Sequence, residues 1–212
     1  MKLILITGAP ASGKSSIAKA VSEMIQVSHI SKDGFKIQLF EKYGFTSHKE
    51  KKRLSILGED IMYDHILNSI RNNEDIIVDN NFKNFDRIRN VIKMANVHVK
   101  VICIYCEADY NILAYRYNER ISSGVRHKAL YTLNQYPIIK GISEFHPYIS
   151  KDDVERIQRE VSECYYGDRI LMINTDHIGD DFCAICQKIV SFINELDDEK
   201  NETMARKNKV LL

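Results

Sequence analysis

The 212-residue sequence has no tryptophan, only three prolines and nine glycines, and no long apolar run. The scarcity of proline and glycine argues against an interdomain linker or a low-complexity chain. No window approaches the roughly 18 apolar residues of a membrane span, and the apolar run at residues 3–6 is too short for a signal peptide. We therefore expect a single cytoplasmic α/β domain, without a membrane partner.

A large net charge is also missing. The 30 basic residues almost balance the 29 acidic ones, so the formal net charge is +1. Such a chain has no general attraction for nucleic acid or anionic membranes. A small anionic ligand suits this balance better than a long polyanion, although a local basic cleft is still compatible with it.

The cysteines number five, so they cannot all be paired in disulfides within the chain. Four of them form two CxxC pairs, Cys103 with Cys106 and Cys183 with Cys186, and the fifth is Cys164. Zinc binding is one interpretation of this spacing. On a strand, however, the first pair points to opposite faces, and the second pair falls on an apolar helical stretch that favours core positions. We favour reduced structural thiols.

Apolar runs that are typical of buried strands alternate with helical patterns along the chain. The expected strands are 2–7, 26–30, 75–78, 97–105 and 169–174. The expected helices are 15–24, 34–43, 49–71, 84–95, 109–122, 151–165 and 180–196. This alternation predicts a doubly wound, parallel sheet of about five strands, with its ligand crevice at the carboxyl ends of the strands. We expect residues 1–196 to form this domain, and 197–212 to be a charged tail that is a frayed helix or disordered.

A complete phosphate-binding motif follows the first expected strand and precedes the first helix. It reads Gly8, Ala9, Pro10, Ala11, Ser12, Gly13, Lys14 and Ser15, and Ser16 comes next. Glycines let the backbone N–H groups turn toward phosphates, lysine adds a positive charge, and the hydroxyl of Ser15 suits Mg²⁺. A glycine-rich turn with a surface lysine is the alternative. We expect ATP and Mg²⁺ to bind here, but this motif occurs in kinases, switches and motors alike.

The chain up to about residue 196 resembles the small P-loop kinases, the group of polynucleotide 5′-hydroxyl kinases, chloramphenicol phosphotransferase, zeta toxins and uncharacterised AAA-type kinases. In that group an aspartate after the second strand acts as the base toward the acceptor hydroxyl. The matching residue is Asp33 in the segment HISKDGFK. The alternative for Asp33 is the N-cap of the helix that begins near Gly34. Lys36 departs from the group, whose members often have an arginine there to grip the acceptor.

The same resemblance assigns functions to the segment IIVDNNF and to three arginines. It implies that Asp79 holds Mg²⁺ or orients the acceptor, and that Asn81 contacts the acceptor; an Asx-turn is the alternative for Asp79. It also implies a helical lid at about residues 122–150, in which Arg116 stacks on adenine and the catalytic arginines Arg120 and Arg126 reach the phosphates.

A solvated helix face with weak ion pairs is the alternative for these arginines. The loop after the last strand, which begins at Thr175, is expected to line the adenine.

Two segments, 34–71 and 129–150, are left to form the acceptor pocket. Both contain aromatic residues, which are Tyr43, Phe45, Tyr63, Tyr131, Tyr136, Phe145 and Tyr148. We predict a kinase that transfers the γ-phosphoryl group of ATP to a hydroxyl of a small molecule: a nucleoside, a sugar or an antibiotic-like compound. An ATPase or switch that acts on a protein partner is one alternative, and a polynucleotide 5′-hydroxyl kinase is another, which the neutral charge disfavours.

Overall fold

The three central strands of the sheet are apolar on both faces. In the computed structural model, which describes residues 1–82, 85–162 and 166–209, Leu3 and Leu5 pack on one face of the sheet and Ile4 and Ile6 on the other. All four side chains are fully buried. The strands are β1 (Lys2–Gly8), β2 (Ser28–Ser31), β3 (Ile76–Asp79), β4 (Lys100–Glu107) and β5 (Arg169–Asn174). Burial on both faces is what a parallel sheet covered by helices requires.

All four strand pairings are parallel, and the strand order is β2-β3-β1-β4-β5. The predicted α/β class, parallel sheet and number of strands are confirmed. Because β1 is central, the chain leaves it toward one edge and returns past it from β3 to β4. The carboxyl end of β1 therefore lies at the switch point where ligands bind in such sheets.

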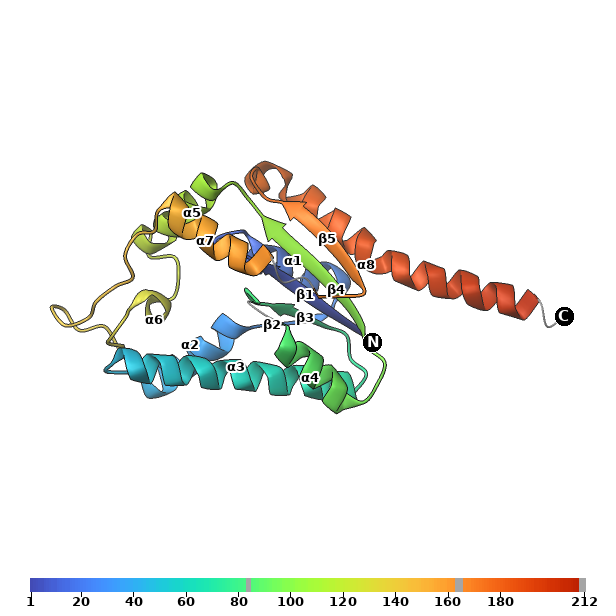
Figure 1. Cartoon of the computed structure of the whole chain (residues 1–212), viewed down its shortest axis with the longest axis horizontal. Coiled ribbons are helices and arrows are strands. Elements are labelled where there is room, and N and C mark those ends of the chain that lie inside the picture. Colours follow the sequence, from blue (N-terminus) through green and yellow to red (C-terminus); the bar gives the residue numbers. More distant parts are fainter. Residues whose placement is uncertain (83–84, 163–165, 210–212) are drawn as a thin grey trace.

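Helices cover both faces of the sheet (Figure 1). They are α1 (Lys14–Ile25), α2 (Lys32–Tyr43), α3 (His48–Arg71), α4 (Asp86–Ala95), α5 (Tyr110–Ser122), α6 (Lys128–Tyr131), α7 (Lys151–Ser162) and α8 (Ile178–Lys209). Helices α3 and α4 pack on one face, and α1 and α8 on the other. Beside the carboxyl end of β1, α5 and α7 pack around Ala9, while α2, α3 and α6 share a separate small core.

Several expected boundaries are shifted. The expected strands 26–30 and 97–105 begin two to three residues later because Gln26 and Asn96, both left-handed, cap the preceding helices. Residues 197–209, the described part of the expected tail, continue α8 away from the sheet (Figure 1). The boundary at residue 196 stays a prediction, and the expected helix residues 84 and 163–165 lie outside the described residues.

The cysteines of the first CxxC pair lie on opposite faces of β4 as expected, since Cys103 is level with Leu5 and Cys106 packs with Ile4 and Ile6. The second expectation is half wrong: Cys186 is buried, but Cys183 is exposed at the outer edge of the apolar face of α8. Cys164 lies outside the described residues. In the described part of the chain, no group of three or more acidic, histidine or cysteine side chains is arranged to hold a metal ion. Nor is any helix there apolar and long enough to cross a bilayer.

Candidate active site

The phosphate-binding loop curls between β1 and α1, and two of its turns require glycine. Gly8 has φ 144°, and a Cβ atom there would lie 2.2 Å from the carbonyl oxygen of Cys106. Gly13 has φ 81°, and its Cβ would lie 2.4 Å from Cδ1 of Ile178. Real Cβ atoms do not approach so closely. At Gly8 the obstacle is backbone and cannot move away, whereas at Gly13 a Cβ would require the end of the Ile178 side chain to move. The loop thereby exposes the N-terminus of α1, where backbone amides favour an anion.

Lys14 is half-buried at the start of α1 and donates from Nζ to the carbonyl oxygen of Ala9, 3.3 Å away. Burial lowers the pKa of this lysine, and the carboxylates of Asp79 and Asp33 act against that effect. Ser15 and Ser16 are exposed in the first turn of α1. The expected phosphate ligands thus surround one helix N-terminus, and the lysine is within electrostatic range of two carboxylates, one at the end of β3 and one in α2.

Asp79 ends β3 and is only 5% exposed. Its Oδ1 is buried and has no hydrogen-bond partner among the described residues. A buried carboxylate oxygen without a donor is costly unless a ligand or water satisfies it. Carboxylate and hydroxyl oxygens are ligands that Mg²⁺ prefers, and Ser15 lines the same cavity as Asp79. These two residues therefore fit a magnesium ion.

Asp33 lies in the first turn of α2, which begins at Lys32 and not near Gly34. Ser31 is the N-cap, because its Oγ accepts a hydrogen bond of 3.1 Å from the backbone N–H of Gly34. The alternative that Asp33 serves as the N-cap is therefore wrong. Its side chain is free to face the cavity instead.

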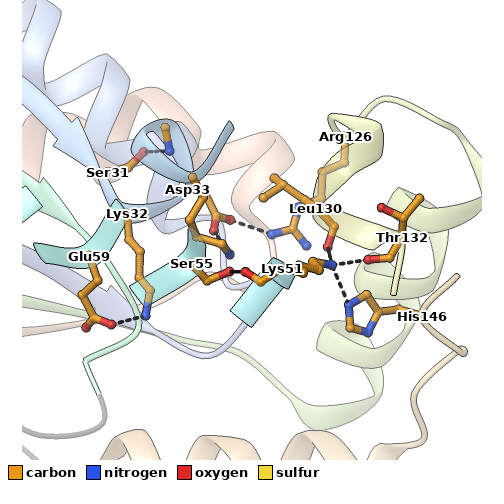
Figure 2. Close-up of polar contacts among 12 residues, drawn as sticks. Ser31, Lys32, Asp33, Lys51, Ser55, Glu59, Arg126, Leu130, Thr132 and His146 are labelled. Atoms are coloured by element: carbon orange, nitrogen blue, oxygen red, sulfur yellow. Dashed lines mark hydrogen bonds and ion pairs between the residues drawn. The ribbon is translucent and has the colours of Figure 1, made fainter. Parts of the chain in front are cut away.

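Two cations hold the carboxylate of Asp33. Lys36 Nζ lies 2.9 Å from Oδ1, and an Arg126 guanidinium nitrogen lies 2.6 Å from Oδ2 (Figure 2). Burial on its own would raise the pKa of Asp33, but Lys36 and Arg126 together hold it well below the ordinary value. Asp33 is thus a firmly ionised carboxylate, and Arg126 reaches it across 93 residues of sequence.

The loop, α2 and the segment after α5 enclose a cavity of about 590 Å³. Its lining residues are Pro10, Ala11, Lys14, Ser15, Ser16, Ser31, Lys32, Asp33, Gly34, Lys36, Ile37, Asp79, Asn80, Asn81, Arg120, Val125, Arg126, His127 and Leu130. The structure therefore brings together most residues expected from the sequence, including Asn81. It adds Asn80, which only the neighbouring aspartate signalled, and His127, which from the sequence alone was interpreted as a structural histidine.

None of the aromatic residues expected at the acceptor pocket lines this cavity. Phe45 and Tyr136 stack on each other instead, with ring centroids 6.1 Å apart, and Tyr131 packs against Phe145 at 5.9 Å. Tyr63 is buried in the core beneath Arg87. These five rings thus contribute to the packing of α2, α3 and the chain after α6, whereas Tyr43 and Tyr148 are exposed.

A second cavity of about 380 Å³ lies on the other side of the loop. Its lining residues are Ala11, Gly13, Ser16, Arg116, Arg120, Ile178, Gly179 and Phe182. Ala11, Ser16 and Arg120 line both cavities. This arrangement gives Arg120 access to both ends of a ligand that crosses the loop.

Arg116 and Thr175 are tied to the loop after β5. The Arg116 guanidinium donates to the carbonyl oxygens of Thr175 and Asp176, at 2.8 and 2.9 Å. Thr175 is fully buried, and its hydroxyl donates to the carbonyl oxygen of Glu107 at 2.9 Å. Thr175 therefore braces the loop, while Arg116 and Phe182 form walls of the smaller cavity; the sequence pattern did not single out Phe182.

Comparison with known proteins agrees with this geometry. A predicted kinase from Chloroflexus aurantiacus superposes with a TM-score of 0.71 at 23% identity, covering 89% of this chain and 96% of its own. A gluconokinase from Sinorhizobium meliloti gives 0.54 at 12% identity over 95% and 97% of the two chains. A sugar kinase from Janibacter sp. gives 0.52 at 11% identity over 92% and 95%. No curated protein sequence matches significantly.

The sequence model of an AAA domain family matches residues 3–132, which is more than half of the chain and includes the loop, Asp33, Asp79 and Arg126. At identities below 25%, the solved structures establish the fold alone. Their shared architecture is that of the P-loop NTPases, and all three are named as kinases. The protein accordingly belongs to this AAA domain family and has the α/β fold of the small P-loop kinases.

Proposed function

We propose that the protein is a kinase that transfers the γ-phosphoryl group of ATP to a hydroxyl of a small, non-aromatic acceptor. The observation that carries this proposal is the position of Asp33, whose carboxylate faces the same cavity as Lys14 and Ser15. A hydrolytic switch needs no second binding wall opposite its phosphate loop. Here such a wall exists, and it contains a charged pair of Asp33 and Arg126.

In this mechanism the triphosphate crosses the loop from the smaller cavity to the larger one. Arg116 and Phe182 flank the adenine ring, and the N-terminus of α1 and Lys14 hold the phosphates. Ser15 and Asp79 would hold Mg²⁺, which neutralises charge on the transferred group. Arg120 and Arg126 lie where guanidinium groups stabilise the equatorial oxygens of that group.

Asp33 orients the acceptor hydroxyl and takes its proton. The hydroxyl must displace one of the two cations that now contact the carboxylate, and we assign this to Arg126, whose guanidinium can fork onto phosphate oxygens instead. Since the pKa of Asp33 is low, the carboxylate is ionised and always ready to accept a hydrogen bond. The bond between the γ-phosphorus and ADP breaks, and the acceptor oxygen bonds to this phosphorus. The proton of the hydroxyl passes to Asp33 late in this step, as suits a loose transition state.

The lining of the acceptor wall indicates the acceptor class. Its polar groups include Ser31, Asp33, Lys36, Asn80, Asn81, Arg126 and His127, and among the described lining residues no phenylalanine or tyrosine offers a stacking surface. A polyhydroxyl compound such as a sugar suits this wall better than a nucleobase or an aromatic antibiotic. Two structures that share the fold are named as a gluconokinase and a sugar kinase, which is compatible with this preference.

An acceptor screen with γ-labelled ATP tests the proposal. Sugars, sugar acids and other non-aromatic polyhydroxyl compounds should receive label, whereas nucleosides and a 5′-hydroxyl oligonucleotide should not. If no acceptor receives label and only slow hydrolysis is seen, the kinase proposal is wrong. Turnover that rises only with a protein partner would support a switch instead.

Asp33→Asn tests the assignment of the base. We expect transfer to fall by about 10² to 10⁴, the usual contribution of general base catalysis, with the ATP dissociation constant unchanged. Asp64→Asn, an exposed aspartate of α3, is the matched control and should keep full activity. Transfer at the wild-type rate by Asp33→Asn would refute the assignment.

A further inference from the structure

A buried lysine outside the expected site ties the segment after Arg126 to the body of the protein. Lys51, in the second turn of α3, is 7% exposed, whereas its neighbours Lys49 and Lys52 are exposed. Lysine is rarely buried to this degree unless its ammonium group has partners. Its position therefore needs a specific explanation.

The Lys51 ammonium group has three polar neighbours (Figure 2). It donates to the backbone carbonyl oxygen of Leu130 at 3.3 Å and to that of Thr132, and it lies 3.4 Å from Nε2 of His146. An ammonium group has three donors, and the two carbonyl groups use two of them. Among the described contacts of Nζ there is no carboxylate, so the interaction fixes backbone position rather than pairing opposite charges.

The two carbonyl groups belong to the end of α6. The last carbonyl groups of a helix lack hydrogen-bond donors within the helix. Lys51 of α3 donates to them instead. Arg126 lies just two residues before the start of α6. Ala129 and Leu130 of α6 pack in one small core with Phe40 of α2.

Backbone pairing strengthens the same attachment. Phe45 and Tyr136 exchange two hydrogen bonds of 2.8 Å, and His146 donates from its backbone to Tyr131 at 2.8 Å. The segment that contains the expected lid is therefore docked on α2 and α3. Helix α2 also carries Asp33, so one packed unit contains both partners of the Asp33 and Arg126 ion pair.

We propose that Lys51 is a positioning residue of the reaction, which holds α6 against α3 so that Arg126 reaches Asp33 and the transferred phosphoryl group. This inference rests on the proposed function for its catalytic consequence. Its structural consequence does not require an acceptor: without Lys51, the guanidinium of Arg126 should no longer be held on Asp33. The pKa of Asp33 then reports the position of Arg126 directly.

The test is a carboxyl titration of Asp33 by ¹³C NMR in four proteins: wild type, Lys51→Met, Arg126→Gln and the double variant. Methionine keeps the apolar length of lysine. We expect Lys51→Met to raise the pKa of Asp33 clearly when Arg126 is present and hardly at all in the Arg126→Gln background. An equal shift in both backgrounds would show a direct charge effect of Lys51 and overturn the proposal, as would no shift in either.

Two controls make the outcome specific. Lys52→Met, an exposed lysine on the same helix, should leave the pKa of Asp33 unchanged. Lys51→Gln keeps an amide donor for the same carbonyl groups, so it should fold where Lys51→Met does not, and it should shift the pKa less. A Lys51→Gln protein with wild-type amide exchange in residues 127–146 but an Asp33 pKa raised as far as in Lys51→Met would contradict the proposal, because the segment would still be docked.

The kinetic arm uses the acceptor found in the screen. Lys51→Met should lower kcat at least tenfold with an unchanged ATP dissociation constant, and it should have no further effect on Arg126→Gln. If the wild type phosphorylates no acceptor, the proposed function fails while the Asp33 titration still decides the contribution of Lys51. If transfer is found and the two substitutions act additively on kcat, Lys51 does not act through Arg126.

Discussion

The close packing of the phosphate-binding loop makes a quantitative prediction for its second glycine. Gly13 and Gly141 have nearly the same φ, 81° and 83°, but their surroundings differ. A Cβ at Gly13 meets Ile178 Cδ1 at 2.4 Å, whereas a Cβ at Gly141 meets no atom within 4 Å. The pair separates the cost of backbone conformation from the cost of the contact.

The left-handed conformation costs an alanine about 1–2 kcal/mol, which the smaller entropy of the unfolded alanine chain reduces by about 0.4–1 kcal/mol. Gly141→Ala should therefore lower the free energy of unfolding by about 1 kcal/mol. Gly13→Ala must also move the end of Ile178 out of its rotamer, at about 0.5–1.5 kcal/mol. We expect a total of about 2 kcal/mol and weaker ATP binding, because α1 shifts with the loop.

Gly8→Ala should be the most destabilising of the three. Its Cβ would meet a backbone carbonyl of β4 at 2.2 Å, and no side-chain rotation relieves that contact. The strained φ costs about 1–3 kcal/mol and overpacking about 1–3 kcal/mol more. The sum approaches the total stability of many small domains, about 5 kcal/mol at the lower end.

Urea unfolding at pH 7 measures the series, and calorimetry measures ATP binding. Ile178→Ala provides the internal test, since it removes the side-chain end that a Cβ at Gly13 would meet. Gly13→Ala added to Ile178→Ala should therefore lower the free energy of unfolding by the backbone cost alone. Equal destabilisation by Gly13→Ala and Gly141→Ala, or an additive double variant, would refute the described packing of Gly13 on α8.

Two further predictions concern titration and metal binding. Burial, followed by the positive charges of Lys51, Arg126, Lys36 and His48, lowers the pKa of His146 to about 4. Its protonation therefore opposes folding, and stability that is complete above pH 6.5 is lost as the pH falls toward 4. At pH 5 the wild type should lose about 1–2 kcal/mol relative to His146→Gln; identical thermal stability profiles from pH 7 to 5 would contradict this. Asp79→Asn should raise the Mg²⁺ concentration needed for half-maximal transfer at least tenfold while ATP binding without metal is unchanged, and an unaltered Mg²⁺ dependence would exclude Asp79 from the metal site.

Local patterns in the sequence were sufficient for the architecture. The central strands are apolar on both faces, whereas the helices are not apolar all round. Strands and helices alternate along the chain, which predicts a parallel sheet because crossover helices must cover both of its sides. The loop from Gly8 to Ser15 was equally readable, since its glycines are required by backbone geometry within a few residues. The same holds for Asp33 and Asp79, which follow strands whose carboxyl ends meet at one edge.

The structure decided what those patterns left open. The helix start at Lys32 removed the N-cap alternative for Asp33, because Ser31 supplies the cap locally. Phe45 stacks on Tyr136 and Tyr131 packs against Phe145, and none of these four rings lines the larger cavity. Nothing local predicts the pairing of Phe45 with Tyr136 or of Asp33 with Arg126, since in each pair the partner lies about 90 residues away along the chain.

The amino-acid sequence by itself determined that a phosphate-binding turn joins the first strand to the first helix. Both the backbone geometry of the turn and the spacing of apolar residues depend on residues that are close together in the sequence. Only the tertiary structure decided that Arg126 contacts Asp33, that Lys51 is buried beneath α6 and that polar residues line the larger cavity opposite the loop. These features depend on which distant segments pack together, and that packing is set by the whole core.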